Sequence, residues 1–415
     1  MKDMPSRRLG VAIVGLGGAV GTTMVAGIEL IRQGKAGTTG LPLAETLHPG
    51  LVAYQDLVFG GWDLYADDLA AAAAQHRVLD GPSLDAVRPA LSALKPWAPA
   101  ANVDFCKNVT GAAGSNRVTK RGQADSIAED LRRFKAEAGV HNVVVVNLAS
   151  TERLVDPTLP QFQTPEAFEA ALDADDPAIG PAMLYAYAAI ASGVAYANFT
   201  PSVAADLPAL VKLAKRNRVP VAGKDGKTGQ TLLKTVLAPA LRGRALQVDG
   251  WFSTNILGNR DGLALDDPAS LASKLGTKGS VLDQILGYHV ANHKVRIEYY
   301  PPRGDDKEAW DNIDVSGFLG QRMQLKLNFL CKDSILAAPL AIEIARCLDL
   351  AHQRNEGGVL DALGTFFKAP QTADGKEPEH AWFEQERRFR MWLDGTGDME
   401  ATGLTKAARR LANVR

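Results

Sequence analysis

A glycine-rich segment near the N-terminus is the first feature of the sequence that could bind a cofactor. It follows an apolar run, residues 9–14, and precedes a segment of helical character, residues 22–32. Glycines between a strand and a helix permit a tight turn and let a pyrophosphate approach the backbone at the positive end of the helix dipole. The pattern therefore predicts a dinucleotide-binding loop. Its residues are Gly15, Gly17, Gly18, Ala19, Val20 and Gly21.

Asp63 is the predicted partner of the adenosine ribose. In a dinucleotide-binding fold this acid is expected about 20 residues beyond the glycines, and the sequence offers nothing suitable there. Asp63 follows the predicted strand 56–59, so we interpret residues 34–50 as an insertion before that strand. A carboxylate at this position would repel a 2′-phosphate, which favours NAD over NADP. The alternative role for Asp63 is that of a helix N-cap.

A second polar, glycine-rich turn, residues 223–231, lies between a predicted strand, 219–222, and a predicted helix, 232–240. Such a turn presents the N–H groups of a helix start and forms an anion site by its geometry. Lys224 and Lys227 add positive charge. The spacing does not match a Walker A loop, so we predict a phosphate site of another kind. A capped helix start is the alternative.

Lys274 and Lys278 lie four residues apart. If the segment is helical, both amines project from one face, and their repulsion lowers the pKa of one amine, which can then act as a base. Asn255, Asn259 and Asp261 follow a predicted strand, in positions suited to binding hydroxyl groups or a cation. A solvated surface is the alternative for each of these residues.

The order of the predicted elements indicates an α/β fold. Strands and helices alternate up to about residue 231, which is the signature of a parallel sheet. The character then changes, and the last of the later strands alternates cleanly between apolar and polar residues, as in an antiparallel sheet with one covered face. These later strands are predicted at residues 246–253, 294–300 and 323–330.

This change of character divides the chain. We predict a Rossmann-like NAD-binding domain of residues 1–231 plus 336–415, with an inserted α/β catalytic and oligomerisation domain of residues 232–335. Residues 97–122 are irregular and rich in Asn, Gly and Thr, which indicates an active-site loop. Helices are predicted at residues 335–352, 359–367 and 382–393.

Composition excludes several classes of partner. The 46 basic and 47 acidic side chains leave a net charge of −1, too balanced for a broad phosphate-backbone footprint, so no nucleic acid is expected. Three widely spaced cysteines exclude a disulfide framework and a CxxC zinc site, and they fit a reducing cytoplasm. Residues 177–205 carry no charge, but their Ala, Gly and polar content indicates buried core rather than a membrane span. No membrane partner is therefore expected.

Eight segments together resemble the myo-inositol-1-phosphate synthase family, and they run in family order to about residue 370. The matching segments are GLGGAVGTT (15–23), DLVFGGWD (56–63), STE (150–152), GKDGKTGQTLLKTVLAP (223–239), NILGNRDG (255–262), SKLGTKGSV (273–281), YYPPRGDDKEAWDN (299–312) and CKDSILAAPL (331–340).

The resemblance implies a homotetrameric isomerase that acts on a small sugar phosphate and retains NAD, and the cysteine content places it in the cytoplasm. D-Glucose 6-phosphate would be oxidised at C5, enolised, closed by an aldol step between C6 and C1, and reduced to 1L-myo-inositol 1-phosphate. The resemblance also allows a monovalent or divalent cation, for which no ligands are assigned.

The resemblance also implies roles for individual residues. Lys274 would be the base, and Lys278 would stabilise the alkoxide at C1. Asp225 and Asp261 match family acids that orient lysines or lie near the nicotinamide and a cation. Lys332 is a further catalytic candidate, although it stands where eukaryotic members have an acid. The phosphate would bind at Thr228, Gly229, Gln230 and Thr231, with Asn255 and Asn259 also contacting substrate. The cofactor would be contacted by Ala149, Ser150, Thr151 and Asp333, in addition to the glycine loop and Asp63.

Two departures from the family pattern leave alternatives open. Glu298 aligns with an active-site lysine of eukaryotic members, and Lys332 or Arg303 could restore that charge. Lys368 and Lys376 are the candidates for a further family lysine near the C-terminus. The alternative functions are a paralogue that cyclises another sugar phosphate, such as a ketose phosphate, an NAD-binding protein without turnover, and a dehydrogenase that releases NADH.

Overall fold

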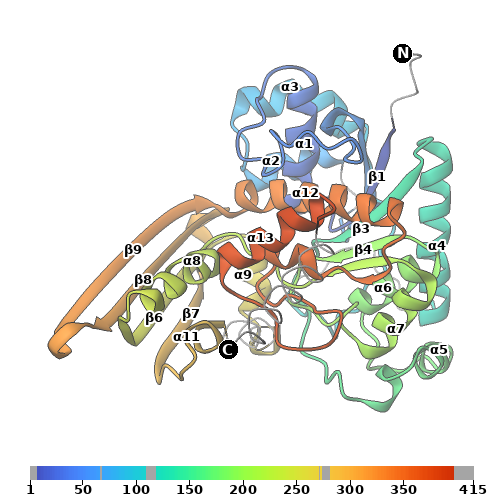
Figure 1. Ribbon diagram of the computed structural model, residues 1–415. Helices are drawn as coiled ribbons and strands as arrows, with labels where there is room; N and C mark the ends of the chain where they lie inside the picture. Colours follow the sequence, from blue (N-terminus) through green and yellow to red (C-terminus); the bar gives the residue numbers. More distant parts are fainter. Residues whose placement is uncertain (1–6, 66–67, 109–117, 271, 273–280, 397–415) are drawn as a thin grey trace.

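The computed structural model describes residues 7–65, 68–108, 118–270, 272 and 281–396 of the chain. Its elements form two sheets, and helices cover both faces of the first (Figure 1). The α/β fold predicted from the sequence is thereby confirmed. The proposed domain division at residues 231 and 336 stays a prediction.

The first sheet is parallel throughout, in the order β10-β5-β4-β3-β1-β2. Both β1 and β3 are buried along their whole length, which explains the apolar sequence of β1 and the four consecutive valines of β3. The order reverses between β1 and β3, and ligands of open parallel sheets bind at such a switch point, at the carboxyl ends of the strands. The strands are β1 Leu9–Val14, β2 Leu57–Trp62, β3 Asn142–Asn147, β4 Ala195–Asn198, β5 Pro220–Gly223 and β10 Gly358–Val359.

Two hydrophobic cores sandwich this sheet. One lies between the sheet and α1, α2, α3, α12 and α13. The other lies between the opposite face and α4, α5, α6 and α7. The helices of the first group are α1 Ala19–Arg32, α2 Leu69–His76, α3 Gly81–Ser92, α12 Asp333–Gln353 and α13 Trp382–Leu393. Those of the second are α4 Lys120–Glu137, α5 Pro165–Asp173, α6 Pro181–Ala191 and α7 Pro208–Asn217.

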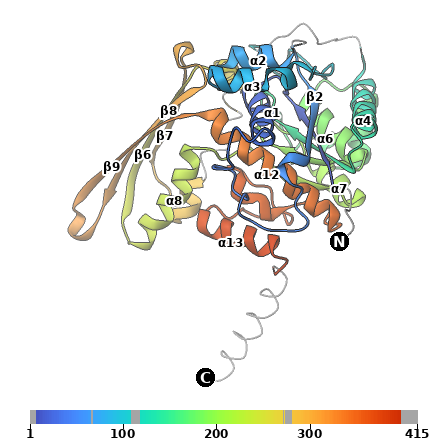
Figure 2. The ribbon, with the colours of Figure 1, turned by 90° about the horizontal axis from the view of Figure 1, so that it is seen from above.

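The second sheet projects from the body as an arm (Figure 2). Its order is β7-β6-β8-β9, and α8 and α11 cover one face through a small core around Trp251. Short helix α9 lies between β6 and α11 in the chain. The bounds are α8 Gln230–Gly243, β6 Gln247–Leu257, α9 Arg260–Leu265, α11 Val281–Leu286, β7 Asn292–Tyr299, β8 Asp306–Ser316 and β9 Arg322–Lys332.

Three features differ from the elements predicted. The β6–β7 pair is parallel, so the second sheet is mixed rather than antiparallel. Strand β8 was not predicted, because charged residues occur at both its inward and its outward positions and hide the alternation of apolar and polar residues. The helix predicted at 359–367 is β10 followed by the 3-10 helix Asp361–Phe366. The charge-free stretch 177–205 supplies α6 and β4, both almost wholly buried, as predicted.

Candidate cofactor and substrate site

One pocket of about 310 Å³ opens at the carboxyl ends of the first sheet's strands, where the second sheet meets it. Its walls come from the glycine loop, the ends of β2 and β3, the turn after β5, the starts of α9, β8 and α12, and Lys368. The irregular segment predicted as an active-site loop contributes residues 99–103, 105 and 106, whereas residues 109–117 of that segment lie outside the described residues.

The glycine loop is built as a cradle for an anion. Gly15 has a φ of +88°, and the amides of Gly15 and Leu16 both donate to the carbonyl of Trp62, at 2.8 and 3.0 Å. A Cβ on Gly21 would lie 2.5 Å from the Leu16 carbonyl oxygen. Gly18 begins α1 without a side-chain cap, so the helix start presents unpaired amides to the pocket. This geometry fits the pyrophosphate of a dinucleotide.

Asp63 lies beside this loop at the end of β2 and is 8% exposed. Its carboxylate accepts hydrogen bonds from the Gly17 amide at 2.8 Å and the Tyr65 amide at 3.0 Å. Burial raises the pKa of Asp63, and these amides oppose the shift. The helix cap is Asp68 instead, which accepts from the Ala71 amide at 2.8 Å. The N-cap alternative for Asp63 is therefore wrong, and its role at the ribose stays a prediction.

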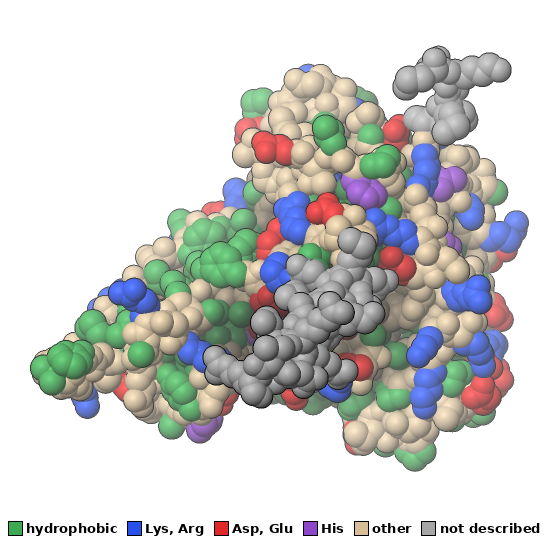
Figure 3. Space-filling view, viewed as in Figure 1, with side chains coloured by type: hydrophobic (Ala, Val, Ile, Leu, Met, Phe, Trp, Pro, Cys, Tyr) green, Lys and Arg blue, Asp and Glu red, His purple; other side chains and the backbone are tan. Residues whose placement is uncertain are grey.

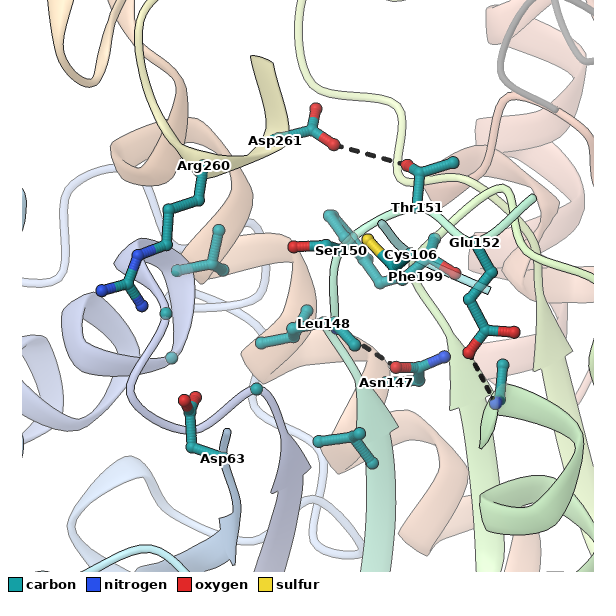
Figure 4. Close-up of a pocket in the computed structure, with 18 of the residues that line it drawn as sticks. Asp63, Cys106, Asn147, Leu148, Ser150, Thr151, Glu152, Phe199, Arg260 and Asp261 are labelled. Carbon is teal, nitrogen blue, oxygen red and sulfur yellow. Dashed lines mark hydrogen bonds between the residues drawn. The ribbon is translucent and has the colours of Figure 1, made fainter. Parts of the chain in front are cut away.

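The end of β3 forms the floor of the pocket. Ala149, Ser150 and Thr151 all line it, and the cofactor contacts that the resemblance gives them stay a prediction. Glu152 also lines it and was not singled out. Its carboxylate accepts from the Ala182 amide at 2.8 Å, at the start of α6 (Figure 4), and burial raises its pKa to about 7. Glu152 therefore ties the β3 loop to α6.

Two lysine–carboxylate pairs bring positive charge to the pocket wall. The Nζ of Lys368 lies 2.7 Å from a carboxylate oxygen of Asp225, and both residues are buried. The Nζ of Lys307 lies 3.3 Å from a carboxylate oxygen of Asp333, which also accepts from the Thr228 hydroxyl at 3.2 Å. All five residues line the pocket. In each pair the carboxylate offsets part of the free-energy cost of removing the ammonium from water.

The structure decides which of the candidate cations reach the pocket. Lys376 is exposed and pairs with Asp374, so of the two C-terminal candidates only Lys368 lines it. Lys332 pairs with Asp306 at 3.2 Å, outside the pocket walls.

Glu298 is exposed on β7 and does not line the pocket. Arg303 also lies outside its walls and bonds to Glu308. Lys307, within the matched segment 299–312, does line the pocket, and the sequence analysis did not single it out.

Only part of the predicted phosphate segment, residues 228–231, reaches the pocket. Thr228 lines the pocket, and Gly229 begins α8 with no side-chain cap. Gln230 and Thr231 are buried at the start of α8, where Gln230 accepts from the Asn255 amide at 2.6 Å and donates to Asp311 at 3.1 Å. Gln230 and Asn255 thus fix the helix start to β6.

The two lysines of this turn, Lys224 and Lys227, do not line the pocket. Lys224 bonds to Asp206 at 2.6 Å. Lys227 is buried against Gln385, and burial lowers its pKa to about 7. Of this turn, Asp225, Gly226 and Thr228 line the pocket, together with Lys307 and Lys368.

Asn259 and Asp261 line the pocket from α9. Asn259 caps this helix by accepting from the Gly262 amide at 3.1 Å, and Asp261 accepts from the Thr151 hydroxyl at 3.4 Å. Lys274 and Lys278 lie outside the described residues, so their predicted roles stay predictions. Within the described part of the chain, no group of three or more His, Cys, Asp or Glu residues could hold a metal ion. Nor does any helix there have the length and apolarity needed to cross a membrane.

Comparisons with known proteins agree with this geometry. The chain matches the family model of myo-inositol-1-phosphate synthase, an NAD-binding family, over residues 39–393. It is 41% identical over 408 residues to inositol-3-phosphate synthase 1 of Bacteroides thetaiotaomicron, covering 93% of this chain and 95% of that one. It is 32% identical over 387 residues to isozyme 1 of Arabidopsis thaliana, covering 84% and 75%.

Solved structures give the same answer. The inositol-3-phosphate synthase of Caenorhabditis elegans superposes with a TM-score of 0.88 at 26% identity, covering 94% of this chain and 86% of that one. A myo-inositol-1-phosphate synthase-related protein from Thermotoga maritima gives 0.79 at 27% identity, covering 94% and 99%. The family resemblance read from the eight sequence segments is confirmed.

Substitution of Gly21 tests the dinucleotide loop. In Gly21→Ala the new methyl group would meet the carbonyl oxygens of Leu16 and Gly15, at 2.5 and 2.8 Å, and force the loop to shift. We expect the Kd for NADH, measured by fluorescence titration, to rise at least about tenfold, a loss of about 1.4 kcal/mol. Gly27→Ala is the matched control, because a Cβ there, in the same helix, meets nothing within 4 Å. Equal affinity in the two variants would contradict the assignment.

Proposed function

Because the chain belongs to the myo-inositol-1-phosphate synthase family, we propose that it converts D-glucose 6-phosphate to 1L-myo-inositol 1-phosphate by an NAD-dependent, redox-neutral cyclisation. The observation that carries the proposal is a single pocket that combines the glycine cradle with two carboxylate-paired lysines, Lys307 and Lys368. A dinucleotide and an anionic sugar both find their binding groups there.

NAD, when bound, supplies a hydride acceptor for C5 of the sugar and a hydride donor for the final reduction. The residues of the chain do the rest. Lys274 accepts the C5 hydroxyl proton, and Lys278 stabilises the alkoxide at C1; both assignments rest on the sequence match. Lys307 and Lys368 stabilise negative charge that develops on the sugar oxygens, since fixed ammonium groups in a partly dry pocket need little reorganisation.

The phosphate is assigned to Thr228 and the first amides of α8, from Gly229 to Thr231. Gln230 and Asn255 act on it by holding the start of α8 in place. Asp225 and Asp333 orient Lys368 and Lys307, and Asp261 is placed near the nicotinamide. The positive charge that Lys332 was expected to restore is assigned to Lys307 instead. A cation receives no ligands in this proposal.

A different sugar phosphate as substrate was the second candidate, and Glu298 was its only support. Glu298 lies exposed on β7, away from the pocket walls, so no observation of the site favours that candidate. We place the protein in the cytoplasm on its cysteine content.

We also propose that the protein is a homo-oligomer, a tetramer by the family resemblance, and that the uncovered face of the second sheet forms the contact. Phe252 and Trp310 stack on this face with ring centroids 6.1 Å apart, and Leu330 beside them is 61% exposed. Phe318 and Leu319, 87% and 78% exposed, form the tip of the arm. Figure 3 shows apolar side chains gathered along this arm. Exposed apolar surface of this extent typically marks an interface.

The reaction is tested by incubating the purified protein with NAD and D-glucose 6-phosphate. We expect phosphorus NMR to show a new secondary phosphate ester, while absorbance shows no net NADH. Lys274→Ala should abolish turnover and leave NAD bound. Net NADH formation would indicate a dehydrogenase, and an inert wild-type protein that converts fructose 6-phosphate would indicate the paralogue.

The assignment of Lys307 predicts a difference between lysines. Lys307→Met should lower kcat about 10²-fold, the usual loss when one group that stabilises developing charge is removed. Lys135→Met, at an exposed position of α4, is the control. A larger loss of kcat in Lys332→Met than in Lys307→Met would return the role to Lys332.

The oligomer contact is tested on the sheet face. Trp310→Asp combined with Leu330→Asp places two charges on the uncovered face, so we expect light scattering to report a smaller species than the wild-type assembly. Leu47→Asp, at a fully exposed leucine of the first sheet's unit, should leave the mass unchanged. A monomeric wild-type protein would refute the proposed interface.

A further inference from the structure

The start of helix α9 lines the pocket. The side chains of its first two residues, Arg260 and Asp261, contact opposite sides of the pocket. The guanidinium carbon of Arg260 lies 3.9 Å from the centroid of the Tyr65 ring, and its Nη2 donates to the side-chain oxygen of Gln75 at 2.9 Å. Asp261 accepts from the Thr151 hydroxyl at 3.4 Å. Figure 4 shows Arg260 directed toward the end that holds Asp63 and Asp261 toward Thr151.

These contacts join parts of the chain that carry different sheets. Tyr65 follows β2 and Gln75 lies in α2, both beside the first sheet, whereas α9 follows β6 of the second sheet. A third contact also joins α9 to the first sheet's part of the chain: the side-chain amide of Asn108 donates to the Leu263 carbonyl at 3.2 Å. On the other side, Asn259 donates to buried Asp305 at 3.3 Å and anchors the helix to the second sheet's unit.

Arg260 lies close to Asp63 and to His76. Its positive charge acts on Asp63 and on His76, which itself contacts the Gly17 carbonyl at 2.8 Å. It therefore lies at the glycine-loop end of the pocket, where the anionic part and the ribose of a dinucleotide would bind. An arginine can stack its plane on a tyrosine and donate hydrogen bonds from its edge at the same time, which a lysine cannot do.

We propose that Arg260 is a cofactor-retaining residue: by stacking on Tyr65 and bonding to Gln75, it fastens α9 across the adenosine end of the pocket and slows the dissociation of NAD. This inference rests on the proposed function. A redox-neutral cycle returns the hydride to the same substrate molecule, so the cofactor must stay bound between the two transfers. A fastened α9 provides that residence time.

The primary test measures cofactor dissociation directly rather than turnover. Wild type, Arg260→Ala, Arg260→Lys and the control Arg244→Ala, an exposed arginine of the second sheet's unit, are loaded with NADH. Dissociation is followed by fluorescence after a chase with excess NAD, and retained cofactor is quantified after gel filtration. We expect the dissociation rate constant to rise about tenfold or more in Arg260→Ala. Arg260→Lys should resemble Arg260→Ala, because charge alone does not replace the stack, and Arg244→Ala should equal wild type.

The fastening is also tested from its other side. Tyr65→Ala should raise the dissociation rate constant, and adding Arg260→Ala to it should raise the rate constant little further, because the two residues act through one contact. During turnover with D-glucose 6-phosphate, Arg260→Ala should leak NADH into solution, which absorbance detects.

The outcomes separate the two hypotheses. If the wild-type protein binds no NAD, the proposed function fails. If it binds NAD and Arg260→Ala dissociates at the wild-type rate, the retaining role is overturned, as it is if kcat falls while dissociation is unchanged. Should Arg260→Ala fail to fold by circular dichroism, Tyr65→Ala and Gln75→Ala decide: faster dissociation in both supports the role, and wild-type rates in both overturn it.

Discussion

Burying positive charge next to an apolar sheet is the constraint on which the site depends. A buried ammonium is costly unless a carboxylate and further hydrogen bonds compensate for its lost hydration. The Lys368–Asp225 pair meets this demand between residues far apart in the chain. Around it the backbones run side by side, with the Lys224 amide donating to the Ala369 carbonyl at 2.9 Å and the Gln371 amide to the Gly223 carbonyl at 2.7 Å. The ion pair therefore also holds the C-terminal segment against the turn after β5.

The parallel sheet provides the complementary half of the site. After the paired strands β1 and β3 the chain continues toward opposite edges of the sheet, to β2 and to β4. Helix α1 begins at this switch point with unpaired amides, so an anion is attracted to the same pocket that the paired lysines border. The carboxylate of Asp63 lies beside the glycine loop, away from the paired lysines, and accepts a hydrogen bond from the Gly17 amide. The first sheet thus supplies the dinucleotide end, and the second sheet with its flanking helices supplies Lys307, Asn259 and Asp261.

Local sequence patterns were sufficient to predict many of the strands and helices but not the contacts between them. Leu9–Val14 and the glycines after it identify a strand, a turn and a helix start, because each depends on neighbouring residues alone. Lys307 could not be found in this way: β8 carries alternating charges that conceal its strand period, and the lysine meets Asp333 only through the pairing of β8 with β9. The parallel β6–β7 pair likewise depends on a crossover that no local pattern records. Asp63 shows the same limit, since excluding its helix-cap alternative required the position of Asp68.

The buried carboxylate of Asp305 also links the parts of the site that belong to the two sheets. Asp305 accepts from the Ser334 amide and hydroxyl, at 3.1 and 2.7 Å, and from Asn259. It thereby connects the start of α12 with the cap of α9, and Lys307 follows it by two residues on β8. Burial raises the pKa of Asp305, and these donors oppose the shift by stabilising the charged form. A displacement of α9 at the pocket mouth would therefore be felt at Ser334, beside Asp333, and so at the carboxylate that holds Lys307. The position of α9 and the placement of Lys307 therefore both depend on Asp305, which lies where the two sheets meet.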